Sequence, residues 1–168
     1  MSYERCGAIY YRLAVREDVP QMARIWGEEG AEGGSSGDRM AAYFEGRHNP
    51  QEALPTRVMY VALEGDTVIA YVAGHLTRRY ACQGELQWIY VAPAYRRRGV
   101  AFELLRLMSA WFADHQSFRV CVNVDPGNIT ACAFYTNSGA MVLNPHWLVW
   151  DRIDKLKSVR GNAADGLE

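Results

Sequence analysis

The residues with the clearest chemistry lie between Tyr90 and Ala101, where an apolar strand runs into a basic turn and the turn opens onto a helix. Three consecutive arginines, 96–98, precede Gly99 in that turn. The first N–H groups of a helix have no partner inside the helix, and the helix dipole places partial positive charge there. The segment therefore predicts a site for an anion, above all a phosphate group. A solvated basic turn with an ordinary turn glycine is the alternative interpretation.

The elements that must hold this turn follow from the spacing of the apolar residues. Alternating and β-branched runs predict strands over 10–14, 57–63, 67–76, 85–91, 119–124, 140–143 and 148–152. Helical spacing predicts helices over 18–27, 38–44, 102–115 and 128–138. The order βααβββαβαββ is typical of a single three-layer α/β/α domain around a mixed sheet. The fifth strand is apolar at most positions, so we expect it near the centre of that sheet.

Length and composition limit the classes of protein to which this chain can belong. Its 168 residues, 49% of them hydrophobic, suit one domain, which we expect over 1–155, with a flexible tail over 156–168. The net charge of −1 gives no sign of nucleic-acid or membrane binding. The four cysteines form no metal-binding motif, and the sequence shows no signal peptide. These features predict a reduced, cytoplasmic protein without a metal site.

Three stretches of the chain resemble the GNAT superfamily of N-acetyltransferases. They are Arg12-Leu13-Ala14 with Asp18, Leu86 to Pro93 with Arg96 to Ala101, and Asn128 to Ala140. The first is similar to the family's opening strand and helix start. The second is similar to its coenzyme A motif, Arg/Gln-x-x-Gly-x-Gly/Ala, and the third to its helix with Asn, a small residue, Phe-Tyr and Gly. Ala101 and Ala140 are departures, since the family more often has glycine and a bulky aromatic residue there.

The resemblance implies a GNAT-like sheet that is splayed between its fourth and fifth strands, with acetyl-CoA as the co-substrate. The fourth strand is expected to carry a β-bulge near Tyr90 and to pair its open edge with the pantetheine amides. The Val91 N–H is the expected donor to the thioester carbonyl, and the N–H groups of the basic turn are the expected pyrophosphate ligands. The implied cofactor-binding residues are Ile89, Tyr90, Val91, Arg96, Arg97, Arg98, Gly99, Val100, Ala101, Asn128 and Tyr135. For Asn128, capping of its own helix is an equal alternative.

Acetyl transfer to an amine also needs proton transfer, because an ammonium has no lone pair with which to attack. The resemblance implies Glu85 as a general base acting through water and Tyr135 as the acid that protonates the departing thiolate. The alternatives are an exposed strand-end carboxylate for Glu85 and a half-buried helix tyrosine for Tyr135. His75 and His48 are other candidate bases, since the pKa of histidine suits the task.

The acceptor pocket is expected beside the 27–38 loop, the second helix and the last two strands. That loop is acidic, which suits a cationic amine or simply a solvated loop. The possible aromatic walls, each of which could equally be core, are Trp26, Tyr43, Trp88 and Trp147. We expect the acceptor to be the primary amine of a small molecule, attacking directly in a ternary complex. A protein N-terminus or lysine, or a non-catalytic coenzyme A sensor, are the alternatives. Dimerisation through the C-terminal strands is a further expectation.

Overall fold

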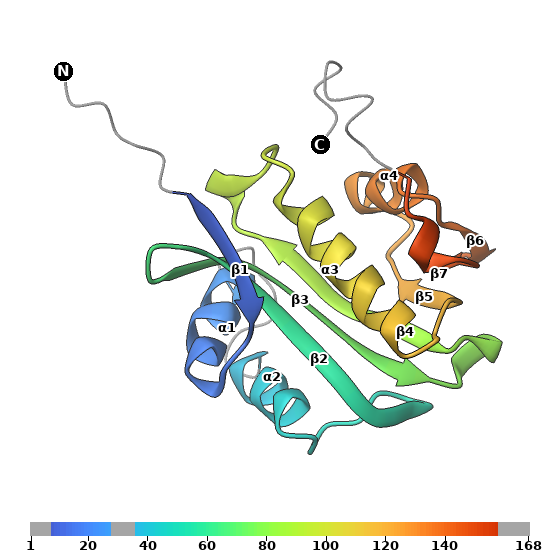
Figure 1. The fold of residues 1–168 in the computed structure, drawn as a ribbon, viewed down its shortest axis with the longest axis horizontal. Coiled ribbons are helices and arrows are strands. Elements are labelled where there is room, and N and C mark those ends of the chain that lie inside the picture. Colours follow the sequence, from blue (N-terminus) through green and yellow to red (C-terminus); the bar gives the residue numbers. More distant parts are fainter. Residues whose placement is uncertain (1–7, 28–35, 158–168) are drawn as a thin grey trace.

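The computed structural model describes residues 8–27 and 36–157, and in these ranges the helices and strands follow in the predicted order (Figure 1). The strands are β1 (Ile9–Leu13), β2 (Ala53–Glu64), β3 (Thr67–Thr77), β4 (Gly84–Val91), β5 (Val120–Asn123), β6 (Met141–Asn144) and β7 (Trp147–Trp150). The longer helices are α1 (Val19–Gly27), α2 (Ser36–Phe44), α3 (Val100–Asp114) and α4 (Ile129–Asn137). Most of the expected tail and most of the acidic loop lie outside the described residues.

The strands form one seven-stranded sheet in the order β1-β2-β3-β4-β5-β7-β6. Every neighbouring pair is antiparallel except β4 and β5, which are parallel and joined through α3. Helices α1 and α2 cover one face of the sheet, and α3 and α4 lie against the other (Figure 1). The predicted three-layer α/β/α fold with a mixed sheet is therefore confirmed, and β5 lies inside the sheet as expected.

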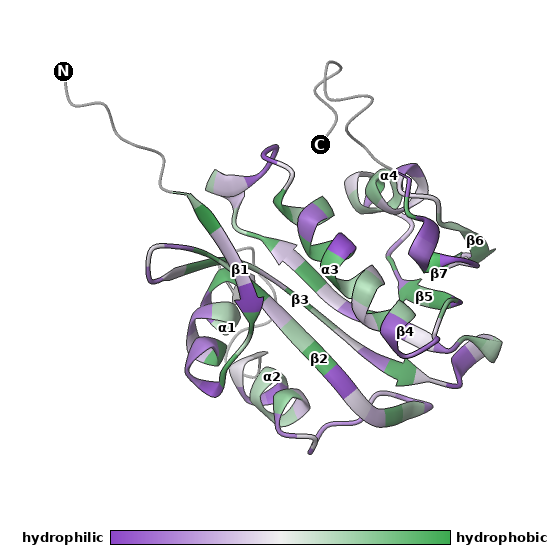
Figure 2. Ribbon diagram, in the orientation of Figure 1, coloured by the Kyte–Doolittle hydropathy of each residue, from purple (hydrophilic) through white to green (hydrophobic). Residues whose placement is uncertain are grey.

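Each face of the sheet has its own hydrophobic core, which is why β3 is apolar along nearly its whole length. Figure 2 shows hydrophobic residues along β2 and β3 and on both α1 and α3. On the α1 and α2 face, Met22 and Met40 are fully buried, and on the α3 face Leu104 and Phe112 are. Glycine at position 84 lets α3 approach the sheet, because a Cβ there would lie 2.4 Å from the Phe112 ring. Burial on both faces fixes β3 and β4 rigidly at the centre of the molecule.

A β-bulge in β4 decides which of its side chains share a face. Ala73 of β3 pairs with Trp88, whereas the next residue, Gly74, pairs with Leu86, so Gln87 is the extra residue. The predicted position near Tyr90 was wrong, since the irregularity lies three residues earlier. Strand alternation alone would put Leu86 and Trp88 on the same face. Because of the bulge, Leu86 packs in the core under α3 while Trp88 packs on the opposite side, against the core under α1 and α2.

The predicted splay between β4 and β5 is also present. Only Gly84–Leu86 of β4 pair with β5, and among the described residues no strand pairs with the same edge of β4 from Gln87 to Val91. We call this segment the open edge of β4. The Ala92 N–H donates to the Ile69 carbonyl on the β3 side. Because successive residues of a strand point their N–H groups to opposite edges, those of Val91 and Ile89 face the open edge.

Asp18 joins β1 to α1, although not as the helix N-cap that its position predicts. It is the last residue of a short 3₁₀ turn, and its carboxylate accepts a hydrogen bond of 2.8 Å from the Val15 N–H. Arg12 of β1 donates to both carboxylate oxygens, at 2.7 and 3.0 Å. The hydrogen bonds among Arg12, Val15 and Asp18 thus fix where α1 begins. None of the helices in the described ranges is long and apolar enough to cross a membrane.

Candidate active site

The basic turn has the backbone geometry of an anion site. Gly99 is the N-cap of α3 and has a φ of 75°, a left-handed conformation that favours glycine. Arg97 also has a positive φ, of 64°. The Glu103 N–H donates to the Gly99 carbonyl and closes the first turn of the helix. The N–H groups before it, at Val100, Ala101 and 102, have no intrahelical acceptor and remain for a ligand.

The arginine side chains of this turn are partly engaged with their own strand. Arg96 donates to the Val91 carbonyl at 3.0 Å, and its guanidinium lies 5.4 Å from the centre of the Tyr90 ring. The Arg98 guanidinium lies 5.3 Å from the Tyr95 ring in the same way. These contacts hold positive charge at the end of the open edge. The backbone N–H groups therefore offer the directional hydrogen bonds, and the arginines offer the surrounding field.

Helix α4 brings Tyr135 to the α3 face of the sheet, beside the splay. Its side chain is 6% exposed and its ring meets Trp150 edge-on, with 5.6 Å between ring centres. Burial raises the pKa of Tyr135 above that of a free phenol, and the thiol of Cys132 raises it further, so the hydroxyl stays protonated at neutral pH. Asn128 accepts a hydrogen bond of 3.1 Å from the Ala131 N–H and thus caps α4.

Glu85 is buried and paired, so its alternative interpretation as an exposed strand-end carboxylate was wrong. The residue is 3% exposed and lies directly opposite His75 in the β3–β4 ladder. The structure brings together the two residues that the sequence offered as separate candidate bases. His75 Nε2 lies 2.6 Å from Glu85 Oε2, and His75 Nδ1 lies 2.9 Å from the Tyr43 hydroxyl. The three side chains form a buried row that we call the Tyr43–His75–Glu85 chain.

The direction of hydrogen bonding along this chain follows from Tyr43. Burial raises the pKa of the Tyr43 phenol, so its hydroxyl keeps its proton and donates to His75 Nδ1. A neutral His75 then carries its proton on Nε2, which lies 2.6 Å from Glu85 Oε2 without the geometry of a hydrogen bond. The histidine ring is therefore in close contact with one carboxylate oxygen. The other oxygen, Oε1, lies 3.7 Å from Arg79 Nε.

Three of the four aromatic residues predicted to line the acceptor pocket, Trp26, Tyr43 and Trp88, form one cluster, and Tyr43 joins it to the Tyr43–His75–Glu85 chain. Trp88 contacts the Tyr43 ring edge-on at 4.9 Å between centres, and the Trp26 ring at 5.7 Å. Trp147 lies apart from them, 5.3 Å from the Tyr80 ring. His48 lies in the loop after α2, where its Nε2 accepts a 3.4 Å hydrogen bond from Arg39, and no contact in the described ranges joins it to Glu85.

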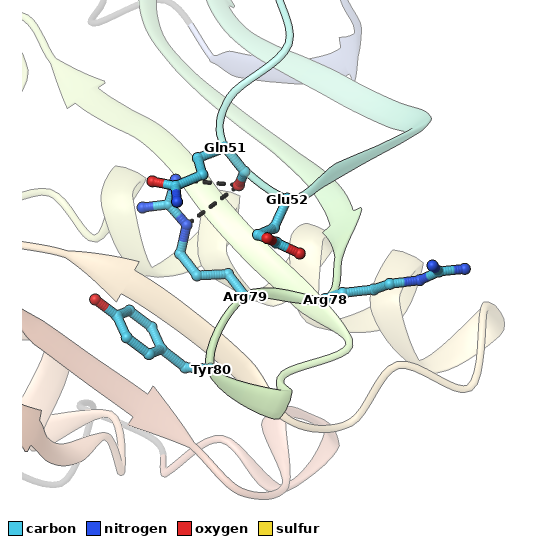
Figure 3. A pocket seen from close by; sticks show the side chains of 5 residues that line it. All are labelled: Gln51, Glu52, Arg78, Arg79 and Tyr80. Atoms are coloured by element: carbon cyan, nitrogen blue, oxygen red, sulfur yellow. Dashed lines mark hydrogen bonds between the residues drawn. The ribbon is translucent and has the colours of Figure 1, made fainter.

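A cavity of about 350 Å³ is lined by Gln51, Glu52, Arg78, Arg79 and Tyr80 (Figure 3). Arg79 both lines this cavity and contacts the buried carboxylate of Glu85. It is not among the predicted site residues, because nothing in the sequence marks one of the two adjacent arginines, Arg78 and Arg79, as part of a site. The signal that could have identified Arg79 is the pairing of β3 with β4, because it brings the connection between these strands close to Glu85.

The two candidate catalytic side chains lie on opposite faces of the splayed sheet. Tyr135 packs in the core under α3, together with Leu86 and Val122 at the closed end of the splay. Glu85 faces α2, where it meets His75 and, through it, Tyr43.

Known proteins with this arrangement agree with the sequence resemblance. A model of the Acetyltransferase (GNAT) family matches residues 21–140. A GNAT-family acetyltransferase from Staphylococcus aureus Mu50 is 13% identical with a TM-score of 0.68, and the match covers 85% of this chain and 98% of that one. PaiA N-acetyltransferase from Thermoplasma acidophilum, solved in complex with coenzyme A, is 13% identical with a TM-score of 0.61, over 86% and 99% of the two chains.

Arabidopsis thaliana NAA60, solved in complex with a bisubstrate analogue, is 14% identical with a TM-score of 0.64, over 90% of this chain and 100% of that one. The search of curated proteins gave no match. At these identities the solved structures establish the fold alone. The family model, however, covers most of the sequence and includes the strand, basic turn and helix described above. The chain therefore belongs to the GNAT family of acetyltransferases.

Proposed function

We propose that this protein transfers the acetyl group of acetyl-CoA to the primary amine of a small molecule, by direct attack in a ternary complex. The observation that carries the proposal is the open edge of β4, which ends at the glycine-capped start of α3. An unpaired strand edge that leads into an anion site fits a ligand with peptide-like amides at one end and phosphates at the other.

The residues proposed for acetyl-CoA divide between these two features. The backbone of Ile89 and Val91 would pair with the pantetheine amides, and the Val91 N–H would donate to the thioester carbonyl oxygen. The backbone of residues 96–101 would bind the pyrophosphate, with charge from its arginines. The proposed role of Tyr90 is to support Arg96, on whose guanidinium its ring packs. The Asn128 side-chain amide keeps two N–H donors beyond its capping bond and is proposed as a further cofactor contact.

In the proposed reaction the amine nitrogen forms a bond to the carbonyl carbon, and the bond between that carbon and sulfur breaks. The proton lost by the amine passes through a water to Glu85. The departing thiolate takes a proton from the Tyr135 hydroxyl, and solvent afterwards returns a proton to Tyr135. The position of Glu85 supports the role of base, because its carboxylate contacts Arg79, a residue that lines the neighbouring cavity.

Transfer of radioactive or deuterated acetyl groups to a panel of amines tests the proposal. The panel would hold small primary amines, peptides with free N-termini and lysine peptides, with coenzyme A release and product mass followed together. The proposal expects an acetylated small amine and amine-dependent thiol release. Thiol release that is equal with and without amine, or acetylated peptides with no acetylated small amine, would contradict it. A Gly99→Val variant is the control for product formed without a bound cofactor.

A further inference from the structure

Arg79, which lines the cavity, pairs with the buried carboxylate of Glu85 in β4. Arg79 Nε is 3.7 Å from Glu85 Oε1, and the Arg79 side chain is 19% exposed while that of Glu85 is 4% exposed. Arg79 lines the cavity, whereas Glu85 is not among the lining residues. A molecule that enters the cavity therefore meets the Arg79 guanidinium, which is itself in contact with the Glu85 carboxylate.

Arg79 is fixed in place but is not saturated with hydrogen bonds. Its Nε and Nη2 donate to the Gln51 carbonyl at 3.2 and 3.0 Å (Figure 3). Its guanidinium also lies 4.6 Å from the centre of the Trp147 ring. A guanidinium has five N–H groups. Gln51 takes two of them, and no other hydrogen bond from the Arg79 guanidinium is present among residues 8–27 and 36–157. The remaining N–H groups are preorganised for an anion, and a carboxylate matches their geometry.

The backbone around the cavity is strained, as is common where structure serves binding. Glu52 and Tyr80, which line it, have φ values of 64° and 52°, and Ala81 follows at 57°. Left-handed conformations are uncommon in residues other than glycine and cost free energy. Within the described ranges, the other such residues are Arg97, in the basic turn, and Gln116, after α3. Strain thus gathers at this cavity and at the proposed pyrophosphate site.

We infer that the cavity binds the acceptor, and that the acceptor is an amine with a carboxylate on the neighbouring carbon, as in a free amino acid. Its carboxylate would bind Arg79, and its ammonium would lose a proton through water to Glu85. Opposite charges 3.7 Å apart on the protein are the complement of opposite charges on adjacent atoms of the ligand. The inference rests on the proposed acetyl transfer and specifies its substrate class.

The test compares amine pairs that differ only in the carboxylate. Wild-type protein would be assayed with the L-amino acids and, for those acetylated, with the corresponding L-amino acid amides and decarboxylated amines. The inference expects kcat/KM for the acid to exceed that for either partner by about tenfold or more, which is the range for a hydrogen-bonded charge pair. Amides that are acetylated as well as the acids, or better, overturn it. That outcome leaves acetyl transfer itself intact, whereas a lack of acetylation of every amine overturns both.

Variants of Arg79 test whether this residue causes the preference for amino acids over their amides. Arg79→Gln should raise KM for the acids and reduce the ratio of acid to amide to near one, while Arg79→Lys should keep part of that ratio because it keeps the charge. Arg106→Gln is the matched control, since Arg106 is an exposed arginine on α3 that is paired with Glu103. Calorimetry with acetyl-CoA should give the wild-type Kd in all three variants. A ratio of acid to amide that survives in Arg79→Gln protein with wild-type acetyl-CoA affinity would assign the carboxylate to another residue and overturn the inference.

Discussion

His75 Nε2 lies 2.6 Å from Glu85 Oε2, and the two residues are directly opposite each other on β3 and β4. His75 is fully buried, and its two ring nitrogens contact the Glu85 carboxylate and the Tyr43 hydroxyl. A buried carboxylate needs such a partner, because leaving it without one costs far more than its hydrogen bond contributes. The stability of the centre of the sheet and the geometry of the proposed base are therefore linked.

Replacement of His75 should reveal this link. His75→Leu leaves a buried carboxylate with Arg79 as its nearest partner, and we expect the free energy of unfolding to fall by about 3 to 5 kcal/mol. Urea denaturation of the single variants and of the double variant His75→Leu with Glu85→Leu would measure it. The double variant should be more stable than His75→Leu alone, because no charge then remains buried. Additive losses would contradict the pairing.

A milder substitution at Tyr43, the outer member of the Tyr43–His75–Glu85 chain, tests whether Tyr43 positions His75 or only packs against its neighbours. Tyr43→Phe keeps the ring against Trp88 but removes the donor to His75 Nδ1. We expect a loss of about 1 to 2 kcal/mol in stability, together with a lower kcat and a shift in the pH dependence of kcat. Tyr60→Phe is the control, since Tyr60 is half-buried on the other face. A pH profile identical to that of the wild type would leave Tyr43 a packing residue only.

Tyr135 is expected to matter for turnover but not for binding. Tyr135→Phe removes only a hydroxyl, so the ring contact with Trp150 should survive and stability should change by less than about 1 kcal/mol. If the hydroxyl protonates the thiolate, kcat should fall by about 10²-fold while the Kd for coenzyme A stays within about twofold. Stopped-flow or steady-state thiol release would measure the first and calorimetry the second. Unchanged kcat would remove Tyr135 from the mechanism.

Gly99 provides a test of the anion site that separates strain from charge. Its φ of 75° makes any side chain unfavourable, but asparagine tolerates this region better than a β-branched residue does. We therefore expect Gly99→Val to weaken acetyl-CoA binding by at least about tenfold and Gly99→Asn to weaken it less. Thermal shift and calorimetry with acetyl-CoA would rank the three proteins. Equal affinity in all of them would show that the ligand does not approach this backbone.

Asp18 should make stability depend on pH in a defined direction. Burial raises the pKa of Asp18, but the hydrogen bonds from Arg12 and the Val15 N–H outweigh it, and the net pKa lies below the ordinary value. A lowered folded-state pKa contributes stability that is present above the unfolded pKa of about 4 and is lost as pH falls through the folded value. The Asp18→Asn variant should therefore have a lower free energy of unfolding than the wild type at pH 7, and the two values should differ little near pH 2. A constant difference from pH 7 to pH 2 would contradict this assignment.

Much of the fold could be predicted from the sequence because apolar spacing and turn residues act locally. β5 was expected inside the sheet since its residues are apolar on both faces. The bulge could not be located, because no residue type marks it. Gln87 is the extra residue only because Trp88 must pack under α2 while Leu86 packs under α3. The position of the bulge is therefore determined by packing in both hydrophobic cores and not by the sequence of β4 alone.

At the candidate site, the sequence predicted the local backbone where a motif determines it, and it did not predict the contacts that strand register decides. The basic turn and Gly99 were found from their local pattern. The contact between His75 and Glu85 depends on how β3 turns into β4, and that turn uses left-handed Tyr80 and Ala81, which sequence does not anticipate. Glu85 could therefore be named as a candidate base, but neither its burial nor its partners could be foreseen.

The central claim is that Glu85 accepts the proton of an amine attacking bound acetyl-CoA, and one measurement addresses it directly. Glu85→Gln keeps the size of the side chain and an oxygen that can accept from His75 Nε2, so the fold and the cofactor site should survive. The pH dependence of kcat/KM for amine acetylation would be measured for both proteins, alongside the Kd for acetyl-CoA. The account predicts a loss of about 10²- to 10⁴-fold in kcat/KM with an unchanged Kd. Wild-type turnover in the Glu85→Gln protein would contradict it.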